Sequence, residues 1–185
     1  TSVKTKHHKS ANRCARFPNE NIVAGGAYWS SKDAAKEHPI VINLNYAIGV
    51  TKIKMIEVDW EFVSADICAV VAHEKLHQTQ ARSRNHDPGF TYYGDGTKNQ
   101  QYYGDPDEIE AYGLLLAMRR TILEHDKYDV GELEDEREYS MYLVVFDDNH
   151  YIVDLLNRYY HKYKRSLTKT GGLNVRYRSR RLEYR

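Results

Sequence analysis

The sequence lacks the features that mark membrane-spanning, disulfide-rich and secreted chains. Its 185 residues include only two cysteines, Cys14 and Cys68, too few for a disulfide framework. The longest purely apolar run is the six residues from Ile67 to Ala72, whereas a transmembrane helix needs about 20. Residues 1–16 contain no apolar core of a secretory signal. We therefore expect a cytoplasmic globular protein with reduced thiols, with Cys68 buried, and with no membrane partner.

Neither sign of charge dominates the composition, but the charges are unevenly distributed. The net charge is +1, from 27 basic and 26 acidic residues. Residues 161–185 contain nine Lys or Arg and one acid, Glu183, so the rest of the chain carries −7. We expect a flexible arm over 1–20, a folded domain over 21–170 and a basic tail over 171–185. Such a tail suggests a nucleic acid or the surface of an assembly as its partner.

The hydrophobic pattern predicts an α+β domain with one strand region followed by helices. Pro39–Ala47 is rich in β-branched residues and alternates in polarity, as a strand does. Apolar residues then recur at spacings of three and four over 59–83, which predicts a helix. A second helix begins clearly, because Asp105 suits the N-cap position and Pro106 the first turn. A third helical region spans 134–167, with a polar interruption at its centre.

The first of these helices contains the most informative motif, His73-Glu74-Lys75-Leu76-His77, an HExxH sequence. Residues four apart lie on one face of a helix, so both imidazoles can reach a single Zn²⁺ at about 2.0–2.1 Å. Glu74 is offset from the two histidines and can face a water molecule on the metal, as a general base must. The spacing therefore predicts a catalytic zinc site.

With this motif in place, Pro39 to Arg119 resembles a small zincin metallopeptidase. The segment that begins at Pro106 is similar to the second helix of the gluzincins, whose pattern is Glu-x-x-Ala/Ser-Asp. The resemblance implies that Glu108 is a zinc ligand and that Ala111 permits close helix packing. Tyr112 stands where the family has Asp, so the hydrogen bond expected behind the first histidine is in doubt. In its small size and in this pair of motifs, the chain resembles uncharacterised zincins of phage and bacterial genomes.

Three residues compete for the third ligand position. Glu108 fits the gluzincin spacing, although a capping role also explains it. Glu110 lies about 200° further round the helix, so both cannot face one ion. His86 begins a segment, His-Asp-Pro-Gly-Phe, that resembles the zinc-binding segment of SprT-like proteases. The metzincin pattern is excluded, because its third histidine would fall at Ser83.

The resemblance further implies a small sheet whose edge strand, around Ile42–Tyr46, lies over the HExxH helix and binds extended peptides by strand addition. Oxyanion stabilisation needs a further donor. The candidates lie in the loop between the helices: His86, Tyr92, Tyr93, Tyr102 and Tyr103. Asp66, seven residues before His73, is a candidate to orient a histidine.

The sequence thus predicts zinc-dependent hydrolysis of peptide bonds in a peptide or protein substrate, with Glu74 as general base. Two other functions remain open. One is a non-catalytic structural or binding protein on the same scaffold, associated with a virion if the chain is phage-encoded. The other is a DNA-associated, SprT-like protease that uses its basic tail.

Overall fold

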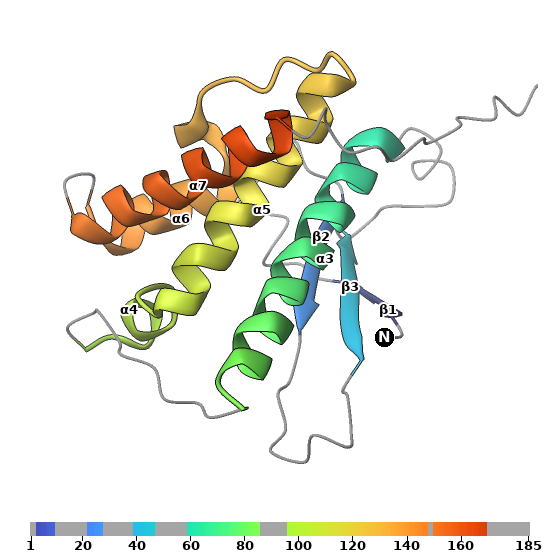
Figure 1. Cartoon of the computed structure of the whole chain (residues 1–185). Helices are drawn as coiled ribbons and strands as arrows, with labels where there is room; N and C mark the ends of the chain where they lie inside the picture. Colours follow the sequence, from blue (N-terminus) through green and yellow to red (C-terminus); the bar gives the residue numbers. More distant parts are fainter. Residues whose placement is uncertain are drawn as a thin grey trace, which may run out of the picture.

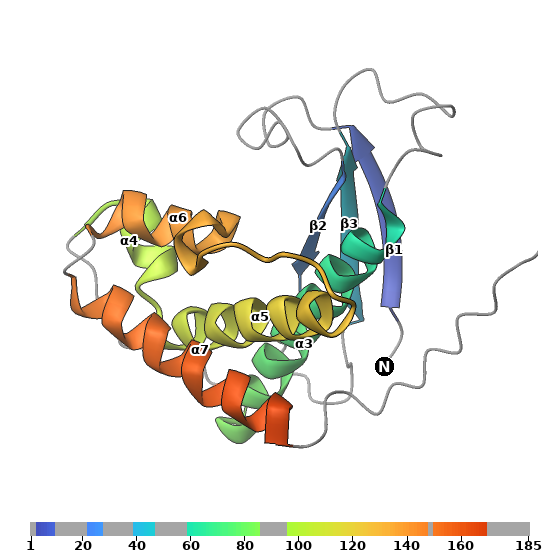
Figure 2. The ribbon, with the colours of Figure 1, turned by 90° about the horizontal axis from the view of Figure 1, so that it is seen from above.

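The computed structural model of the chain describes residues 3–9, 22–27, 39–46, 59–85, 96–147 and 150–169. These residues form a mostly helical molecule with a small sheet. Figures 1 and 2 show the sheet on one side of a long helix, α3, with α5, α6 and α7 on its other side. In chain order the elements are β1 (Val3–Lys9), β2 (Ile22–Ala27), β3 (Ile40–Tyr46), α3 (Trp60–Ser83), α4 (Lys98–Tyr103), α5 (Pro106–His125), η1 (Leu133–Asp135), α6 (Arg137–Val145) and α7 (Tyr151–Lys169).

The sheet has three strands in the order β1-β3-β2. The strand predicted around Ile42–Tyr46 is confirmed, but its expected position at the edge is wrong, because β3 pairs with β1 on one side and β2 on the other. β1 falls within residues 1–20, which the sequence pattern assigned to an arm. It pairs in parallel with β3, from Val3 opposite Ile40 to Lys9 opposite Tyr46. Within the described residues, β2 is the edge strand beside α3.

The two helices with clear start signals lie where the sequence predicts them. Asp59 caps α3, its carboxylate accepting the backbone N–H groups of Glu61 and Phe62. Asp105 caps α5 in the same way through the N–H of Asp107, and Pro106 occupies the first turn. The region predicted as helical over 134–167 is divided into η1, α6 and α7, with the break between Val145 and Tyr151.

Apolar side chains form two buried clusters, one on each side of α5. The first joins α5 to α6 and α7, around Leu116, Tyr142 and Leu156, all fully buried. The second joins the sheet to α3 and α5, around Ile42 and Ala69. Gly113 lets α5 approach α7 closely, since a Cβ there would lie 2.5 Å from the Cβ of Tyr159. α5 is therefore the central helix, packed between α3 and α7.

A buried cluster of charged side chains connects the sheet, α3, α5 and α6. Arg119, only 1 % exposed, donates to Asp66 on α3 and to Glu138 on α6, the latter at 2.7 Å. Asp66 also accepts the backbone N–H of Ala24 on β2, at 2.7 Å. Burial opposes ionisation of Glu138, but Arg119 and Arg137 outweigh it and lower its pKa. The paired charges satisfy one another, so removing one partner would leave others buried and unpaired.

Cys68, expected to be buried, is exposed on α3. Its neighbours Ile67 and Ala69 pack toward the sheet. Because successive residues of a helix point in different directions, Cys68 faces outward although it lies within an apolar stretch of the sequence. None of the described helices is long and apolar enough to cross a membrane.

Candidate metal centre

His73, His77 and Glu108 converge where the middle of α3 meets the first turn of α5. One ligand atom from each lies within 4.8 Å of the others, and this is the one such group of His, Cys, Asp or Glu in the described part of the chain. The two histidines come from successive turns of α3, as the HExxH spacing predicts. Glu108 is the third residue of α5, and its carboxylate turns toward the histidines.

The separations within this triad match those of ligands on one metal ion. The two Nε2 atoms lie 3.0 Å apart, and they lie 3.6 Å (His73) and 3.4 Å (His77) from the oxygens of Glu108. Atoms about 2.0–2.1 Å from one tetrahedral ion would lie about 3.3–3.4 Å from each other. The buried Glu108 Oε2 has no hydrogen-bond partner among the described residues, as a ligand atom would not. The three side chains therefore fit a divalent cation.

The charge balance of the triad also favours a cation. Burial opposes ionisation of Glu108, but the two imidazoles outweigh it and lower its pKa to about 2. Burial likewise opposes protonation of His77, but the carboxylates of Glu108 and Glu74 outweigh it and raise its pKa. Because the Glu108 carboxylate stays ionised at neutral pH, the triad offers a bound cation one full negative charge and two imidazole nitrogens.

Gln80 fixes the orientation of His77. Its Oε1 lies 3.0 Å from Nδ1 of His77, so that nitrogen carries the proton and Nε2 keeps its lone pair toward the triad. Gln80 in turn donates through Nε2 to Glu110, at 3.3 Å. Glu110 accepts from Lys162 and Tyr163 of α7, at 3.0 and 2.7 Å. The ring of His77 is therefore held by a hydrogen-bonded chain that reaches α7.

His73 is held by packing, since none of the described residues forms a hydrogen bond with its Nδ1. Tyr112 contacts its ring edge to face, with 4.7 Å between centroids. The Nδ1 atom of His73 is buried and has no hydrogen-bond partner among the described residues. The substitution of Tyr for the Asp of the gluzincin pattern thus replaces a polar partner with an aromatic one.

An ion pair fixes the distance between the two helices beside the triad. Arg84, the C-cap of α3, forms a two-pronged contact with Asp107 in the first turn of α5, with Nη1 2.9 Å from Oδ1. Bidentate pairs of this kind set geometry as well as energy. Since Asp107 precedes Glu108 directly, the contact places the Glu108 carboxylate against the histidines.

Glu74 lies under β2. Its side chain is buried, and a Cβ built on Gly26 would lie only 2.5 Å from its Oε1 and 2.7 Å from Val70 Cγ1. Any residue with a Cβ at this position of β2 would displace the side chains of Glu74 and Val70. The charge of Glu74 helps to raise the pKa of His77, so the Glu74 carboxylate lies close to the triad. The backbone of β2 at Gly26 therefore covers the Glu74 carboxylate.

The remaining candidates lie in different places. Glu110 points to α7 and Gln80, away from the triad, as the helical offset from Glu108 predicts. Asp66 does not orient a histidine, because it binds Arg119 and the backbone of β2. His86, Tyr92 and Tyr93 lie outside the described residues.

Tyr102 and Tyr103, expected in a loop, lie at the end of α4, and Tyr102 is the one beside the triad. Its hydroxyl lies 3.4 Å from that of Tyr112, and burial together with the charge of Glu108 raises the pKa of Tyr102. Tyr103 is buried, and its hydroxyl donates to Met141 Sδ at 3.6 Å. Tyr102 therefore places a hydroxyl near Glu108, where it can act as a hydrogen-bond donor.

Replacement of Gln80 by Leu is expected to weaken zinc binding by about 10- to 100-fold, because His77 loses the partner that orients it. Isothermal titration of the metal-free protein measures the change. Gln101→Leu, the same substitution at an exposed position of α4, should leave the affinity unaltered. Unchanged affinity in a folded Gln80→Leu protein would show that Gln80 plays no part in holding His77.

Comparisons of the chain with models of protein families, with curated proteins and with solved structures gave no match.

Proposed function

We propose that the protein is a zinc-dependent hydrolase that cleaves peptide bonds. The observation that carries the proposal is the meeting of His73, His77 and Glu108, with separations that suit one ion and with Glu74 one residue along the same helix. Two histidines and one carboxylate leave a tetrahedral zinc one open position, as catalytic sites require. These are the parts that a hydrolytic zinc centre needs, which supports the proposal.

In this proposal, His73, His77 and Glu108 hold the zinc. When bound, the ion supplies Lewis acidity, which lowers the pKa of water and polarises a carbonyl. Glu74 accepts a proton from the attacking water and passes it to the leaving amine. The Tyr102 hydroxyl, whose pKa is influenced by the nearby charge of Glu108, donates to the developing oxyanion.

The substrate in this proposal is an extended peptide that adds to the sheet at β2. β2 is the edge strand beside α3, and Gly26 brings its backbone next to Glu74. An edge strand offers N–H and C=O groups to a partner strand, although the N–H of Ala24 on β2 already donates to Asp66. A peptide bound there would run past the HExxH motif. In this proposal β2 therefore binds the substrate, the role expected of β3 from the sequence.

Metal removal tests the proposal. The purified protein should contain about one zinc per chain, and chelation should abolish cleavage of a dye-labelled unfolded protein, with zinc restoring it. The control is the same assay with a metal-free sample given Mg²⁺, which prefers oxygen ligands. Tight zinc binding without cleavage of any unfolded substrate would favour the non-catalytic alternative, a scaffold that the metal only stabilises.

A further inference from the structure

The outer face of α7 carries a stripe of cations. Arg158, Lys162, Arg165 and Lys169 recur at spacings of four, three and four, and all four side chains are exposed. This spacing places them on one side of the helix over a length of about 16 Å. His161 lies beside them on the same face. We call these five residues the α7 stripe.

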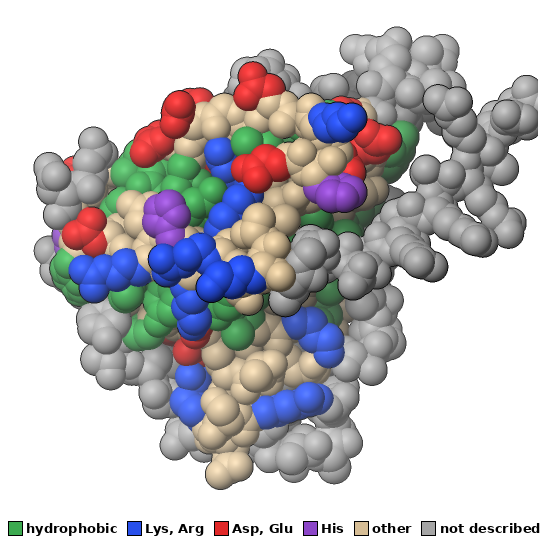
Figure 3. Space-filling model, turned by 45° about the horizontal axis from the view of Figure 1, so that its top comes forward, with side chains coloured by type: hydrophobic (Ala, Val, Ile, Leu, Met, Phe, Trp, Pro, Cys, Tyr) green, Lys and Arg blue, Asp and Glu red, His purple; other side chains and the backbone are tan. Residues whose placement is uncertain are grey.

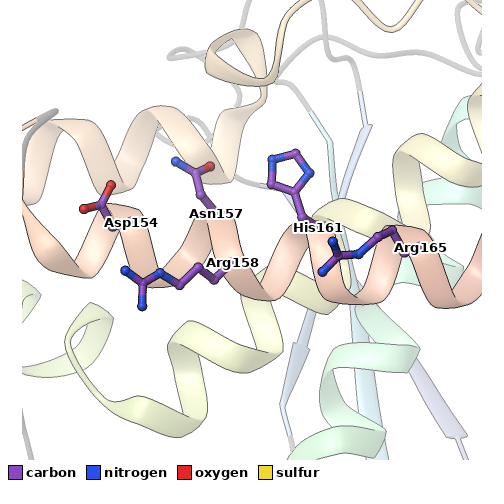
Figure 4. Close-up of a pocket in the computed structure, with 5 residues that line it drawn as sticks. All are labelled: Asp154, Asn157, Arg158, His161 and Arg165. Atoms are coloured by element: carbon purple, nitrogen blue, oxygen red, sulfur yellow. The ribbon is translucent and has the colours of Figure 1, made fainter.

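The side chains of this face line a hollow. Its volume is about 500 Å³, and its walls are formed by Asp154, Asn157, Arg158, His161 and Arg165. Figure 4 shows these five side chains following one another along α7, with the two guanidinium groups two turns apart. Asp154, at the N-terminal end, is the one acidic residue of α7. The amide of Asn157 donates to Tyr139 at 2.9 Å, so the hollow offers mainly imidazole and guanidinium donors to a ligand that accepts hydrogen bonds.

Most of the positive charge on this face is not neutralised within the described part of the chain. No salt bridge joins Arg158, Arg165 or Lys169 to a described acid. Lys162 pairs with Glu110 at 3.0 Å and lies over the rings of Tyr159 and Tyr163, 5.2 and 4.9 Å from their centroids. Figure 3 shows Lys and Arg side chains gathered in a band on the surface seen in that view.

The sequence that follows α7 continues this character. Residues 170–185 contain five Arg and one acid, together with two Tyr. Positive charge therefore persists from the middle of α7 to the last residue of the sequence, which favours a ligand with many negative charges over a single small anion.

We propose that the α7 stripe binds the phosphate backbone of a nucleic acid. Guanidinium groups bind phosphate oxygens in pairs, and a row of them fits a ligand whose charges repeat at regular intervals. The residues of the triad lie on α3 and α5 and those of the stripe on α7, so the two are separate sites, linked only through the contact of Lys162 with Glu110. This proposal does not depend on hydrolysis.

Fluorescence anisotropy with a labelled oligonucleotide of about 20 nucleotides, single-stranded and duplex, tests the proposal. The full chain should bind at about 50 mM salt, and the logarithm of its affinity should fall linearly with the logarithm of salt concentration. Arg158→Gln/Arg165→Gln should weaken binding by about tenfold or more and reduce the salt slope by about 2.

The matched control is Lys98→Gln/Lys127→Gln, which removes the same charge from exposed positions on α4 and after α5. It should retain the affinity and slope of the parent. Equal losses in the two double variants would show that only net charge matters and would overturn the proposal. Absence of binding at low salt, or equally tight binding of poly-glutamate, would overturn it as well. Circular dichroism and zinc titration establish that both variants are folded.

Discussion

Glu74→Gln is expected to lower the rate of peptide hydrolysis by about 100- to 10,000-fold while zinc binding changes little. The carboxylate lies under β2 beside the triad and takes the proton of the attacking water in the proposed reaction. An amide of the same size keeps the packing against Gly26 but cannot accept that proton. The loss should therefore appear in kcat, with KM nearly constant.

Steady-state assays with a labelled peptide measure the effect, and titration with zinc measures the affinity. Glu61→Gln, an identical exchange in the first turn of α3, serves as the control and should leave kcat at the parental value. If Glu74→Gln cleaves as fast as the parent, Glu74 is not the general base.

The second large effect is expected at the third ligand. Glu108→Gln should weaken zinc binding by more than about 100-fold, because it removes the negative charge of the triad and replaces one carboxylate oxygen with an NH2 group that cannot bind a metal. Loss of an outer partner costs 10- to 100-fold in metal affinity, and loss of a ligand should cost more. The low pKa of Glu108 means that this carboxylate is fully ionised at neutral pH, so the whole charge is lost in the variant.

Glu110→Gln is the matched comparison, two residues away on the same helix. Its carboxylate binds Lys162 and Tyr163, so zinc affinity should change by well under tenfold. Competition with a chromogenic chelator gives both values. The opposite pattern, with Glu108→Gln binding zinc normally and His86→Ala losing it, would assign the third position to His86.

The parts of the fold that depend on local signals could be predicted from the sequence. Asp59, Asp105 and Pro106 fix the starts of α3 and α5, because capping chemistry acts within one turn. The HExxH spacing places two imidazoles together for the same reason. The fixed turn of a helix also separates Glu108 from Glu110, although it does not say which of them faces α3.

The parts that depend on long-range contacts could not be predicted. The order of strands in the sheet needs the pairing of β1 with β3, and the polar residues of β1 give no clear strand pattern. Arg119 and Asp66 are ordinary surface residue types in a sequence, and only the packed helices reveal that they are buried against each other. Gln80 gave no signal for the same reason, since its contact with Glu110 joins two helices.

The hydrogen bond from Ala24 to Asp66 sets the alignment of the sheet on α3. Ala24 and Gly26 lie two residues apart, on the same face of β2. A slip of β2 by two residues in one direction would carry the methyl group of Ala24 into the space beside Glu74 that now admits only hydrogen. A slip by one residue would turn the opposite face of the strand toward the helix. The carboxylate of Asp66 therefore fixes the register of β2 on α3. The position of the strand over the HExxH motif thus depends on a residue nearly two helical turns away from that motif.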